Sequence, residues 1–359
     1  MPTDPDTPPD PHSSTHPDLH PSTTPRIVFL GTPEFAVASL DAILRAGYNV
    51  VAVITAMDKP AGRGMQLTES AVKKYAREKG IPILQPEKLK APAFLDELRS
   101  FAADLQIVVA FRMLPEVVWN MPPMGTVNLH GSLLPQYRGA APINWAIING
   151  EPETGVTTFK LRHDIDTGNI LLQEKFPIGP DETAGELHDR MKVIGARLLV
   201  KTIAGLAAGT LNEKPQVGIP RQSDLLRQSD LLPESAVPGP TDTSGLKHAP
   251  KIFTETCRID WTKSTSDIYN LIRGLSPFPA AFTELDGKLL KIYRAAKDPA
   301  PPTTPTSPTL PPGQPDTDNR TYLRFATADG YIRVTEIQWE GKKRMTVADF
   351  LRGYKPRHT

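Results

Sequence analysis

One short stretch of the chain combines residue types that could do chemistry. Asn128 and His130 stand two residues apart in the run Thr126-Val-Asn-Leu-His130. On a β-strand, residues two apart point to the same face of the sheet. A histidine can protonate or hydrogen-bond a developing oxyanion, and an asparagine amide can donate to the same oxygen. The spacing therefore predicts a pair that stabilises an oxyanion.

A carboxylate can join this pair from a segment further along the chain. We expect Asp164-Ile-Asp166-Thr-Gly168 to form a loop between two strands. A carboxylate in that loop could orient His130 or accept a proton. An asparagine, a histidine and an aspartate on one face would make a functional site. The alternative is that they are core polar residues satisfied by hydrogen bonds.

The elements that must position these residues follow from the spacing of apolar residues. Strands are expected at 27–30, 50–54, 107–110, 126–129, 156–161 and 170–176, and helices at 34–46, 70–79, 92–101, 142–149 and 183–208. This alternation indicates βαβ units and a mostly parallel sheet of Rossmann-like α/β type. Ligands of such sheets bind at the carboxyl ends of the strands, where Asn128 and His130 would project. The first turn, Gly31-Thr-Pro33, lacks the G-x-G-x-x-G motif, which argues against an NAD-dependent oxidoreductase.

The C-terminal part of the chain follows a different pattern. Short strands are expected at 282–285, 289–293, 322–326 and 332–337, and helices at 268–275 and 347–351. Several short strands with a helix favour a small OB-like β-barrel. We expect Trp261 and Trp339 in the core of that barrel.

Proline marks the boundaries between these parts. Of the 38 prolines, 21 lie in 1–25, 218–250 and 299–315. Such segments bury too little apolar surface to offset the entropy of ordering them. The predicted organisation is a disordered tail over 1–25, a catalytic domain over 26–212, a linker over 213–250 and a C-terminal domain over 251–359.

Composition excludes several classes of protein. Apolar residues make up 39% and charged residues 23% of the 359 residues, enough for a buried core. No apolar run reaches the length of about eighteen residues that a membrane span needs. The single cysteine, Cys257, excludes a disulfide within the chain and a multi-cysteine zinc site. In the absence of a secretory signal, we expect a cytoplasmic location.

The formal net charge of +1 conceals an uneven distribution. Residues 250–359 hold 17 Lys and Arg against 12 Asp and Glu, a balance of +5, so residues 1–249 carry −4. A basic C-terminal domain is compatible with a nucleic acid or another anionic ligand. A balance of this size is also common on surfaces that bind nothing.

Longer motifs around these residues resemble a known family. The segment from Asn128 to Phe159, followed by Asp164–Gly168, resembles the formyltransferases that use 10-formyltetrahydrofolate. The segments Gly31–Ala36, Lys59–Gly64 and Arg258–Trp261 make the resemblance specific to the methionyl-tRNA formyltransferase family. The resemblance runs in the same order from about residue 26 to residue 355.

The resemblance implies an activity. In this family a formyl group passes from 10-formyltetrahydrofolate to the α-amino group of methionine on initiator tRNA. The family's catalytic trio falls on Asn128, His130 and Asp166. It implies that Asn128 and His130 stabilise the oxyanion, while Asp166 holds His130 and helps to take the proton of the amine. The resemblance implies no metal, and a monomer.

The resemblance also implies where the folate cosubstrate binds. Ser132, Leu133, Leu134 and Pro135 match the family segment that lines the folate pocket. Proline and leucine would give rigid apolar walls for a pterin. The alternative is that these four residues form a buried turn. Arg138, which follows them, could shape the same loop or serve as a structural ion-pair partner.

Basic residues in both parts of the chain are candidates for tRNA binding. Lys59 and Arg63 belong to the loop Lys59–Gly64, which enters the acceptor end of the tRNA in the family; a plain solvated loop is the alternative. Lys251 and Arg273 are candidates for contacts with the tRNA backbone. The same applies to Lys342, Lys343 and Arg344. Each of these C-terminal residues could equally be a solvated surface charge.

The sequence departs from the family pattern at Arg112. It stands in Ala110-Phe-Arg112-Met-Leu-Pro115, where the family usually has glycine after an aromatic residue. This departure leaves the conformation of that loop open. Rival functions are formyl transfer to a sugar amine or to glycinamide ribonucleotide, hydrolysis of formyltetrahydrofolate, and binding of folate or RNA without catalysis. The Lys59–Gly64 loop and the basic C-terminal domain favour tRNA.

Overall fold

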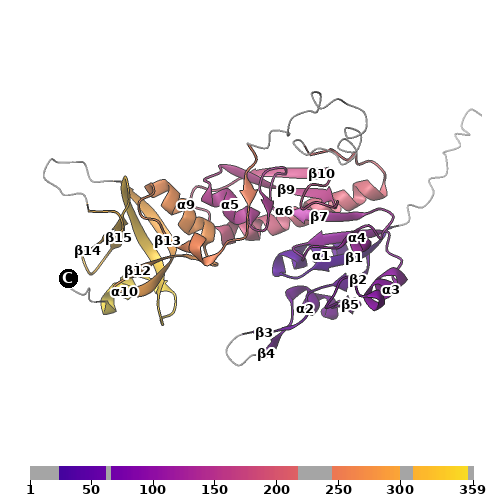
Figure 1. Cartoon of the computed structure of the whole chain (residues 1–359), viewed down its shortest axis with the longest axis horizontal. Coiled ribbons are helices and arrows are strands. Elements are labelled where there is room, and N and C mark those ends of the chain that lie inside the picture. The colour runs from indigo at the N-terminus through magenta and orange to yellow at the C-terminus, as the bar shows by residue number, and fades with distance from the viewer. Residues whose placement is uncertain (1–23, 62–65, 217–244, 300–309, 355–359) are drawn as a thin grey trace, which may run out of the picture.

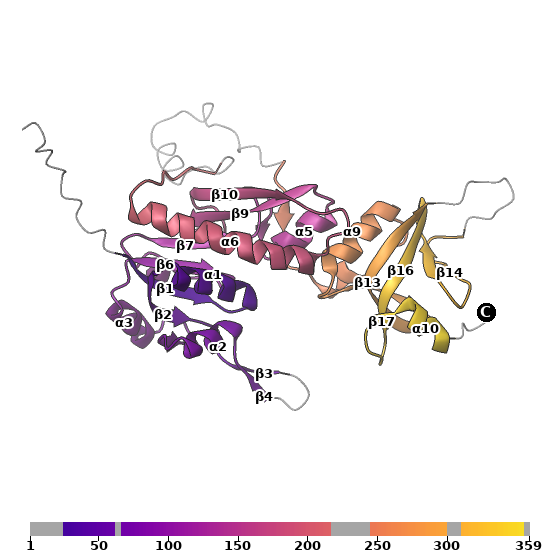
Figure 2. The ribbon, with the colours of Figure 1, turned by 180° about the vertical axis from the view of Figure 1, so that it is seen from behind.

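The computed structural model describes residues 24–61, 66–216, 245–299 and 310–354 (Figure 1). Almost all of the predicted tail over 1–25 therefore lies outside the described residues. Most of the predicted linker over 213–250 lies outside them as well. The described part forms a large α/β layer and a smaller β-rich part, which lie side by side in Figures 1 and 2.

A seven-stranded sheet forms the centre of the N-terminal part. Its strands are β1 (Arg26–Gly31), β2 (Asn49–Ile54), β5 (Ile83–Leu84), β6 (Leu105–Val109), β7 (Thr126–His130), β9 (Glu153–Lys160) and β10 (Ile170–Pro177). They lie in the order β10-β9-β7-β6-β1-β2-β5. The five strands from β7 to β5 are parallel, whereas β9 pairs antiparallel with both β7 and β10. The expected mostly parallel sheet is confirmed.

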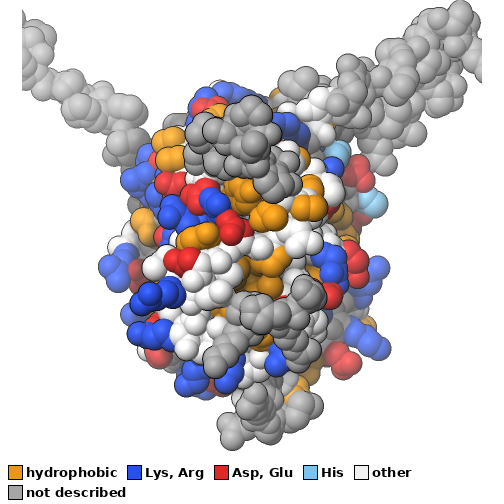
Figure 3. Space-filling model, turned by 90° about the vertical axis from the view of Figure 1, so that its left-hand side faces the viewer, with side chains coloured by type: hydrophobic (Ala, Val, Ile, Leu, Met, Phe, Trp, Pro, Cys, Tyr) orange, Lys and Arg blue, Asp and Glu red, His pale blue; other side chains and the backbone are white. Residues whose placement is uncertain are grey.

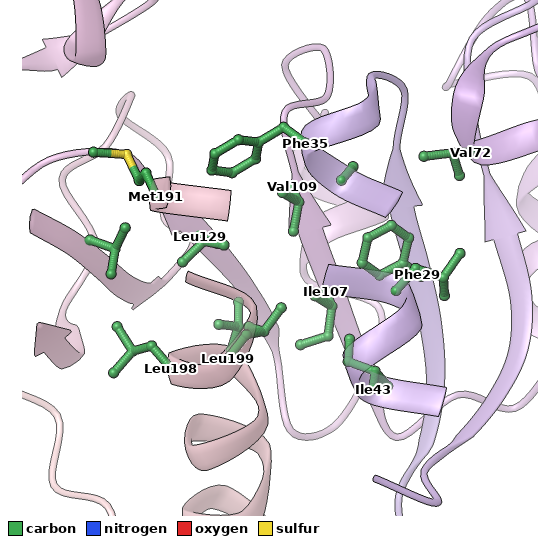
Figure 4. Close-up of a cluster of buried hydrophobic side chains, with 14 of the residues drawn as sticks. Phe29, Phe35, Ile43, Val72, Ile107, Val109, Leu129, Met191, Leu198 and Leu199 are labelled. Carbon is green, nitrogen blue, oxygen red and sulfur yellow. The ribbon is translucent and has the colours of Figure 1, made fainter. Parts of the chain in front are cut away.

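Helices cover both faces of this sheet. They are α1 (Glu34–Arg45), α2 (Ala71–Glu78), α3 (Pro92–Ser100), α4 (Glu116–Trp119), α5 (Pro142–Ile148) and α6 (Ala184–Ala207). Phe29 of β1 packs in the cluster that α1 and α6 complete, which includes Ile43 and Leu199 (Figure 4). The next residue, Leu30, points to the opposite cluster with Leu98 of α3. Burial on both faces explains why the strands are continuous apolar runs.

The C-terminal part is an antiparallel half-barrel. Its strands are β12 (Ala281–Leu285), β13 (Lys288–Pro299), β14 (Pro315–Thr317), β15 (Leu323–Ala326), β16 (Gly330–Trp339) and β17 (Met345–Thr346), joined by α8 (Thr254–Cys257), α9 (Thr265–Leu275) and α10 (Val347–Gly353). The expected small OB-like β domain is confirmed. Trp261 stacks on Phe325 with ring centroids 4.7 Å apart, and Trp339 packs against Phe350 at the same distance. Both tryptophans border the core, as expected.

The two parts meet where α9 packs against α5 and the start of α6. The Tyr269 hydroxyl donates to Oδ1 of Asp181 at 2.6 Å. Nη1 of Arg273 donates to the carbonyl oxygens of Gly179 at 3.2 Å and Glu182 at 3.1 Å. Because α5 also borders the cavity described below, the C-terminal part contacts a wall of the candidate site. Among the described helices, none combines the length and the apolar character that a membrane span requires.

The long helix α6 begins at a capping box formed by Thr183 and Glu186. The Thr183 hydroxyl accepts from the backbone N–H of Glu186, and the Glu186 carboxylate accepts from the backbone N–H of Thr183. Replacing Thr183 by alanine should lower the free energy of unfolding by about 1 kcal/mol, because the cap bond is lost. Thr183→Ser keeps the hydroxyl and should stay close to wild type in urea unfolding. Equal losses in both variants would contradict the capping role.

The interface between the two parts predicts a pH dependence of stability. Burial, followed by the hydrogen bond to Asp181, raises the pKa of Tyr269 to about 12 from an ordinary value of 10.0. Between those pH values the unfolded chain loses a proton that the folded chain keeps, so stability falls as the pH rises. Tyr269→Phe should therefore have a lower free energy of unfolding than wild type near pH 8. The difference in free energy of unfolding between the two proteins should become smaller above pH 10. A difference that stays constant in urea unfolding up to pH 11 would contradict this assignment.

Candidate active site

A cavity of about 720 Å³ opens at the carboxyl ends of β6 and β7. Its apolar walls include Val108, Phe111, Met113, Leu114, Ile143, Leu161 and Ile165. Its polar groups include Asn128, His130, Asn144 and Asp166. Cavities of this size hold drug-sized organic ligands, and a small number of convergent polar groups fixes the orientation of the ligand. The position is the one that the parallel sheet predicts for a ligand site.

Asn128 and His130 both line this cavity, as the spacing of two predicts. They lie on β7, whose pairing with β6 aligns Asn128 with Val108. His130 is the last residue of the strand and is 6% exposed. The apolar residues Val127 and Leu129 alternate with them along the strand and pack in the core cluster that includes α1 and α6. The strand therefore delivers two polar side chains into the cavity from a rigid element.

One hydrogen bond determines which nitrogen of His130 is available for chemistry. Nε2 of His130 lies 2.9 Å from the carbonyl oxygen of Tyr137. A carbonyl oxygen can only accept, so Nε2 must carry a proton. In the neutral ring Nδ1 is then unprotonated. Nδ1 is also the nitrogen that faces Asp166, at 3.8 Å from its Oδ2.

Asp166 completes the trio but does not bond directly to the histidine. The separation of 3.8 Å is too long for a hydrogen bond. Its Oδ2 instead accepts from the backbone N–H of Gly139 at 3.0 Å. Between the two aspartates of this loop, the side chain of Asp166 is 12% exposed and that of Asp164 is 78% exposed. The structure therefore brings Asp166, and not Asp164, beside His130.

Gln216 is a residue near the site that sequence analysis missed. Its Oε1 accepts from Nε and Nη2 of Arg138, at 3.2 and 2.7 Å. Its Nε2 donates to the carbonyl oxygens of Asp166 and Gly168, both at 2.8 Å. Arg138 thus has a structural role, but its partner is a neutral amide and not an acid. Burial lowers the pKa of Arg138, and the nearby Asp166 charge opposes that shift.

A second element that the sequence did not predict lies next to the loop that carries Tyr137. The short strand β8 (Arg138–Gly139) pairs with β11 (His248–Ala249), which follows the linker. At Gly139, φ is +125° and an added Cβ would lie 2.4 Å from the carbonyl oxygen of Ala249, so only glycine fits. The backbone N–H of Tyr137 donates to the carbonyl of Lys247 at 2.6 Å. The chain after the linker therefore supports the segment from Tyr137 to Ala140, of which Gly139 and Ala140 border the cavity.

Tyr137 is held by its side chain as well as by its backbone. Its hydroxyl donates to Oε1 of Glu151 and accepts from Nδ2 of Asn149 at 3.1 Å. Lys247 makes an ion pair with the same carboxylate. Burial, reinforced by Glu151, raises the pKa of Tyr137 well above its ordinary range. The carbonyl that orients His130 therefore belongs to a residue fixed at several points.

The segment Ser132–Pro135, which we expected to bind the folate, does not border this cavity. Ser132 and Leu134 are buried and Leu133 and Pro135 are half-buried, and a contact of the segment with the folate stays a prediction. The Ser132 hydroxyl donates to the carbonyl of Gln136 at 2.6 Å, and Thr157 binds the backbone at Ser132 and Leu134. These hydrogen bonds engage the hydroxyl and carbonyl groups of Ser132 and the N–H of Leu134 within the protein. Loop residues from Ala110 to Leu114 line the cavity instead.

Arg112 joins the loop from Ala110 to Leu114 to the loop that contains Pro86 and Glu87. Its guanidinium donates to the carbonyl oxygens of Pro86 at 2.5 Å and Glu87 at 3.0 Å. It also lies 5.8 Å from the ring centroid of Phe111. The departure from the family pattern therefore supplies a tether between two loops, and both Arg112 and Phe111 border the cavity.

The predicted loop at Lys59–Gly64 begins as a hairpin. Strands β3 (Lys59–Ala61) and β4 (Gln66–Thr68) pair antiparallel, and Lys59 is exposed on the first of them. Arg63 lies outside the described residues. The hairpin projects from the edge of the molecule beyond α2 in Figures 1 and 2.

The C-terminal basic residues divide into exposed and buried ones. Lys251 is exposed, and its ammonium lies 5.6 Å from the ring centroid of Phe253. Lys342 and Lys343 are exposed between β16 and β17. Arg273 is 7% exposed and bonded to the N-terminal part, so the expectation that it contacts tRNA is wrong. Helical periodicity could not reveal that its face is covered by another domain.

Much of the basic charge of the C-terminal part is paired with acids. Figure 3 views that end of the molecule and shows Lys and Arg interspersed with Asp and Glu toward the margins of the face. Arg344 makes a two-pronged pair with Glu336 at 2.5 and 2.7 Å, and Arg324 pairs with Asp316 at 2.7 Å. These pairs leave the exposed lysines as the better candidates for an anionic ligand.

The arrangement is suited to acyl transfer to an amine. An amide donor and an imidazole converge on one cavity, where they can stabilise a developing oxyanion, and a carboxylate beside them can take up a proton. Within the described ranges, no three His, Cys, Asp or Glu side chains come together in a way that could hold a metal ion. The chemistry that these side chains can do by themselves is acid–base and electrostatic.

Comparison with known proteins identifies a family. The formyl transferase family matches residues 25–203, and the C-terminal domain of formyl transferases matches residues 251–355. Methionyl-tRNA formyltransferase of Parabacteroides distasonis is 52% identical over 336 residues, which are 92% of this chain and 96% of that protein.

Solved structures share the fold at low sequence identity. The sugar 3N-formyl transferase WlaRD, solved with dTDP and 5-N-formyl-tetrahydrofolate, has a TM-score of 0.58 at 19% identity, covering 89% of this chain and 99% of its own. HypX from Aquifex aeolicus in complex with tetrahydrofolic acid has a TM-score of 0.59 at 17% identity and covers 93% of this chain. The chain spans about half the length of HypX. With two matching family domains and a relative of similar length at 52% identity, the chain belongs to the methionyl-tRNA formyltransferase family of formyl transferases.

Proposed function

We propose that the protein transfers the formyl group of 10-formyltetrahydrofolate to the α-amino group of methionyl-initiator tRNA. The product is N-formylmethionyl-tRNA for translation initiation. The observation that carries the proposal is the convergence of Asn128, His130 and Asp166 on one cavity in a chain 52% identical to a methionyl-tRNA formyltransferase. We place the reaction in the cytoplasm and expect a monomer.

The proposed chemistry begins with attack of the neutral amine on the formyl carbon. The carbonyl oxygen then gains negative charge, and the Asn128 amide can donate a hydrogen bond to it. The carboxylate of Asp166 lies where it can take up the proton that the amine must lose. When the carbon–nitrogen bond to the donor breaks, the departing nitrogen gains a proton, and the formyl group is left on the methionine nitrogen.

His130 would act through its Nδ1. Because Nε2 is committed to the carbonyl of Tyr137, a second proton can only be held at Nδ1. Nδ1 also faces Asp166, at 3.8 Å from its Oδ2. The protonated ring can donate to the developing oxyanion and then to the departing nitrogen. Tyr137 therefore bonds to one nitrogen of the ring, and Asp166 faces the other without a direct hydrogen bond.

The apolar walls of the cavity are the proposed place for the pterin of the donor. Phe111, Met113, Leu114 and Leu161 are among the apolar residues that line the cavity. Apolar surfaces suit a ring system, and the polar trio lies at the carboxyl end of β7. Ser132–Pro135 does not border this cavity, and its contact with the folate stays a prediction.

The tRNA would be held by exposed cations in both parts of the chain. Lys59 lies on the β3–β4 hairpin, and Arg63 follows it in the sequence. Lys251, Lys342 and Lys343 are exposed in the C-terminal part. Phosphate contacts of this kind fix the orientation of a nucleic acid without reading its sequence. Specificity for the initiator tRNA would come from contacts near the acceptor end.

Release of tetrahydrofolate tests the activity. We expect the purified protein to release tetrahydrofolate from 10-formyltetrahydrofolate when methionyl-initiator tRNA is present, and to form N-formylmethionyl-tRNA in equal amount. Without tRNA, release should be slow. Formylation of an amino sugar with no formylation of methionyl-tRNA would contradict the proposed acceptor. Equal release with and without tRNA would indicate a hydrolase.

Removing the amide donor tests the catalytic assignment. Asn128→Ala should lower kcat by about 100- to 1,000-fold, because one oxyanion donor typically contributes about 3 kcal/mol to the barrier. Asn120→Ala removes an exposed asparagine outside the cavity and should leave kcat unchanged. Loss of less than about 3-fold in kcat for Asn128→Ala would contradict its role as an oxyanion donor.

A further inference from the structure

The segment that joins the two domains is attached to the catalytic loops at both of its described ends. Gln216 precedes the gap in the described chain, and residues 245–249 follow it. Gln216 contacts the loop that carries Asp166. Lys247 and Ala249 contact the loop that carries Tyr137. The two loops supply the groups that face the two nitrogens of His130.

The Gln216 side chain uses its whole hydrogen-bonding capacity on this loop and its neighbour. It is 5% exposed. Its oxygen accepts two bonds from Arg138, and its nitrogen donates to the carbonyl oxygens of Asp166 and Gly168. A primary amide has two donor hydrogens and two acceptor lone pairs, so none is left over. A buried amide satisfied in this way has one preferred orientation and defines the position of each partner.

The loop held by Gln216 has two constrained backbone positions. Asp166 has a φ of +55°, in the left-handed region, which is uncommon for residues with a side chain although aspartate adopts it more often than most. Gly168 is packed so closely that an added Cβ would lie 1.6 Å from the carbonyl oxygen of Lys160. A residue in an unfavourable backbone conformation persists only where its surroundings impose it. Here the two bonds from Gln216 hold the carbonyl oxygen of Asp166, whose carboxylate faces His130, and that of Gly168, two residues further on.

The opposite end of the joining segment reaches the same carboxylate by another route. Ala249 accepts from the backbone N–H of Ala140 at 2.7 Å and pairs in register with Gly139. The N–H of Gly139 donates to Oδ2 of Asp166 at 3.0 Å. The carboxylate is therefore located from one side by Gln216 through its own backbone and from the other by β11 through Gly139.

We propose that Gln216 is a positioning residue for the reaction: it places Asp166 against Nδ1 of His130, so that the interdomain segment contributes to the rate of formyl transfer. The inference rests on the proposed function. Gln216 touches no reacting atom, since it is absent from the cavity lining. Its effect should therefore fall on kcat and not on the binding of either substrate.

Two substitutions separate the donor role of Gln216 from its acceptor role. Gln216→Glu keeps an oxygen for Arg138 but loses both donors to the loop. Gln216→Met keeps a similar length and loses all four bonds. We expect both variants to lower kcat by about 10- to 100-fold, as a displacement of about 1 Å at a catalytic group does. The KM for each substrate should stay within about 2-fold of wild type.

Thr202→Val is the matched control for loss of buried hydrogen bonds. Thr202 is fully buried and bonds to Thr158 and to the carbonyl of Leu198, away from the cavity. It should lose thermal stability while keeping kcat. Wild-type kcat in Gln216→Glu would overturn the proposal, because the donors to the loop would then be dispensable. A fall in kcat for Thr202→Val as large as that for the Gln216 variants would also overturn it.

A crystal structure of Gln216→Met provides a readout that does not depend on activity. We expect the Asp166 carboxylate to leave the N–H of Gly139, with His130 still bonded to the carbonyl of Tyr137. An unmoved Asp166 would overturn the positioning role even if the wild-type protein transfers formyl groups. If wild type fails to formylate methionyl-tRNA, the proposed function fails, and displacement of Asp166 still decides what Gln216 does.

Discussion

The hydrogen bond between Nε2 of His130 and the carbonyl of Tyr137 is the interaction on which the site depends. It commits one nitrogen of the ring to the protein and leaves the other for chemistry. A backbone carbonyl can do this only if its own position is fixed. The Tyr137 carbonyl is held in place by the pairing of β8 with β11 and by the hydrogen bond from the Tyr137 hydroxyl to Glu151. The nitrogen is thus selected by Tyr137, seven residues away, whose own position depends on the distant strand β11.

Asp166 reaches His130 from the neighbouring strand. β7 ends at His130, whereas the antiparallel strand β9 ends at Lys160, opposite Val127 near the start of β7. The loop that follows β9 must therefore run back along β7 to bring Asp166, 36 positions from His130 in the sequence, beside the imidazole. The C-terminal part packs on α5, which borders the same cavity. The proposed tRNA-binding residues and the proposed catalytic trio therefore lie on parts of the chain that are in direct contact.

Sequence patterns predicted the features of the site that depend on local periodicity. Asn128 and His130 share a face because the strand repeat of two is a local property, and the family resemblance selected Asp166. The direction of the turn at Ser132–Pro135 could not be predicted, because it depends on bonds from Thr157 in another strand. Gln216 gave no signal, since its partners lie 48 to 78 positions away and a lone glutamine has no motif.

The most direct test of the account is a crystal structure with 5-formyltetrahydrofolate, a donor analogue that keeps the formyl group. We expect the pterin against Phe111 and Leu114, and the formyl oxygen about 3 Å from Nδ2 of Asn128 and Nδ1 of His130. Nε2 of His130 should still bond to Tyr137. A folate bound outside this cavity, or a formyl group directed away from both side chains, would contradict the account.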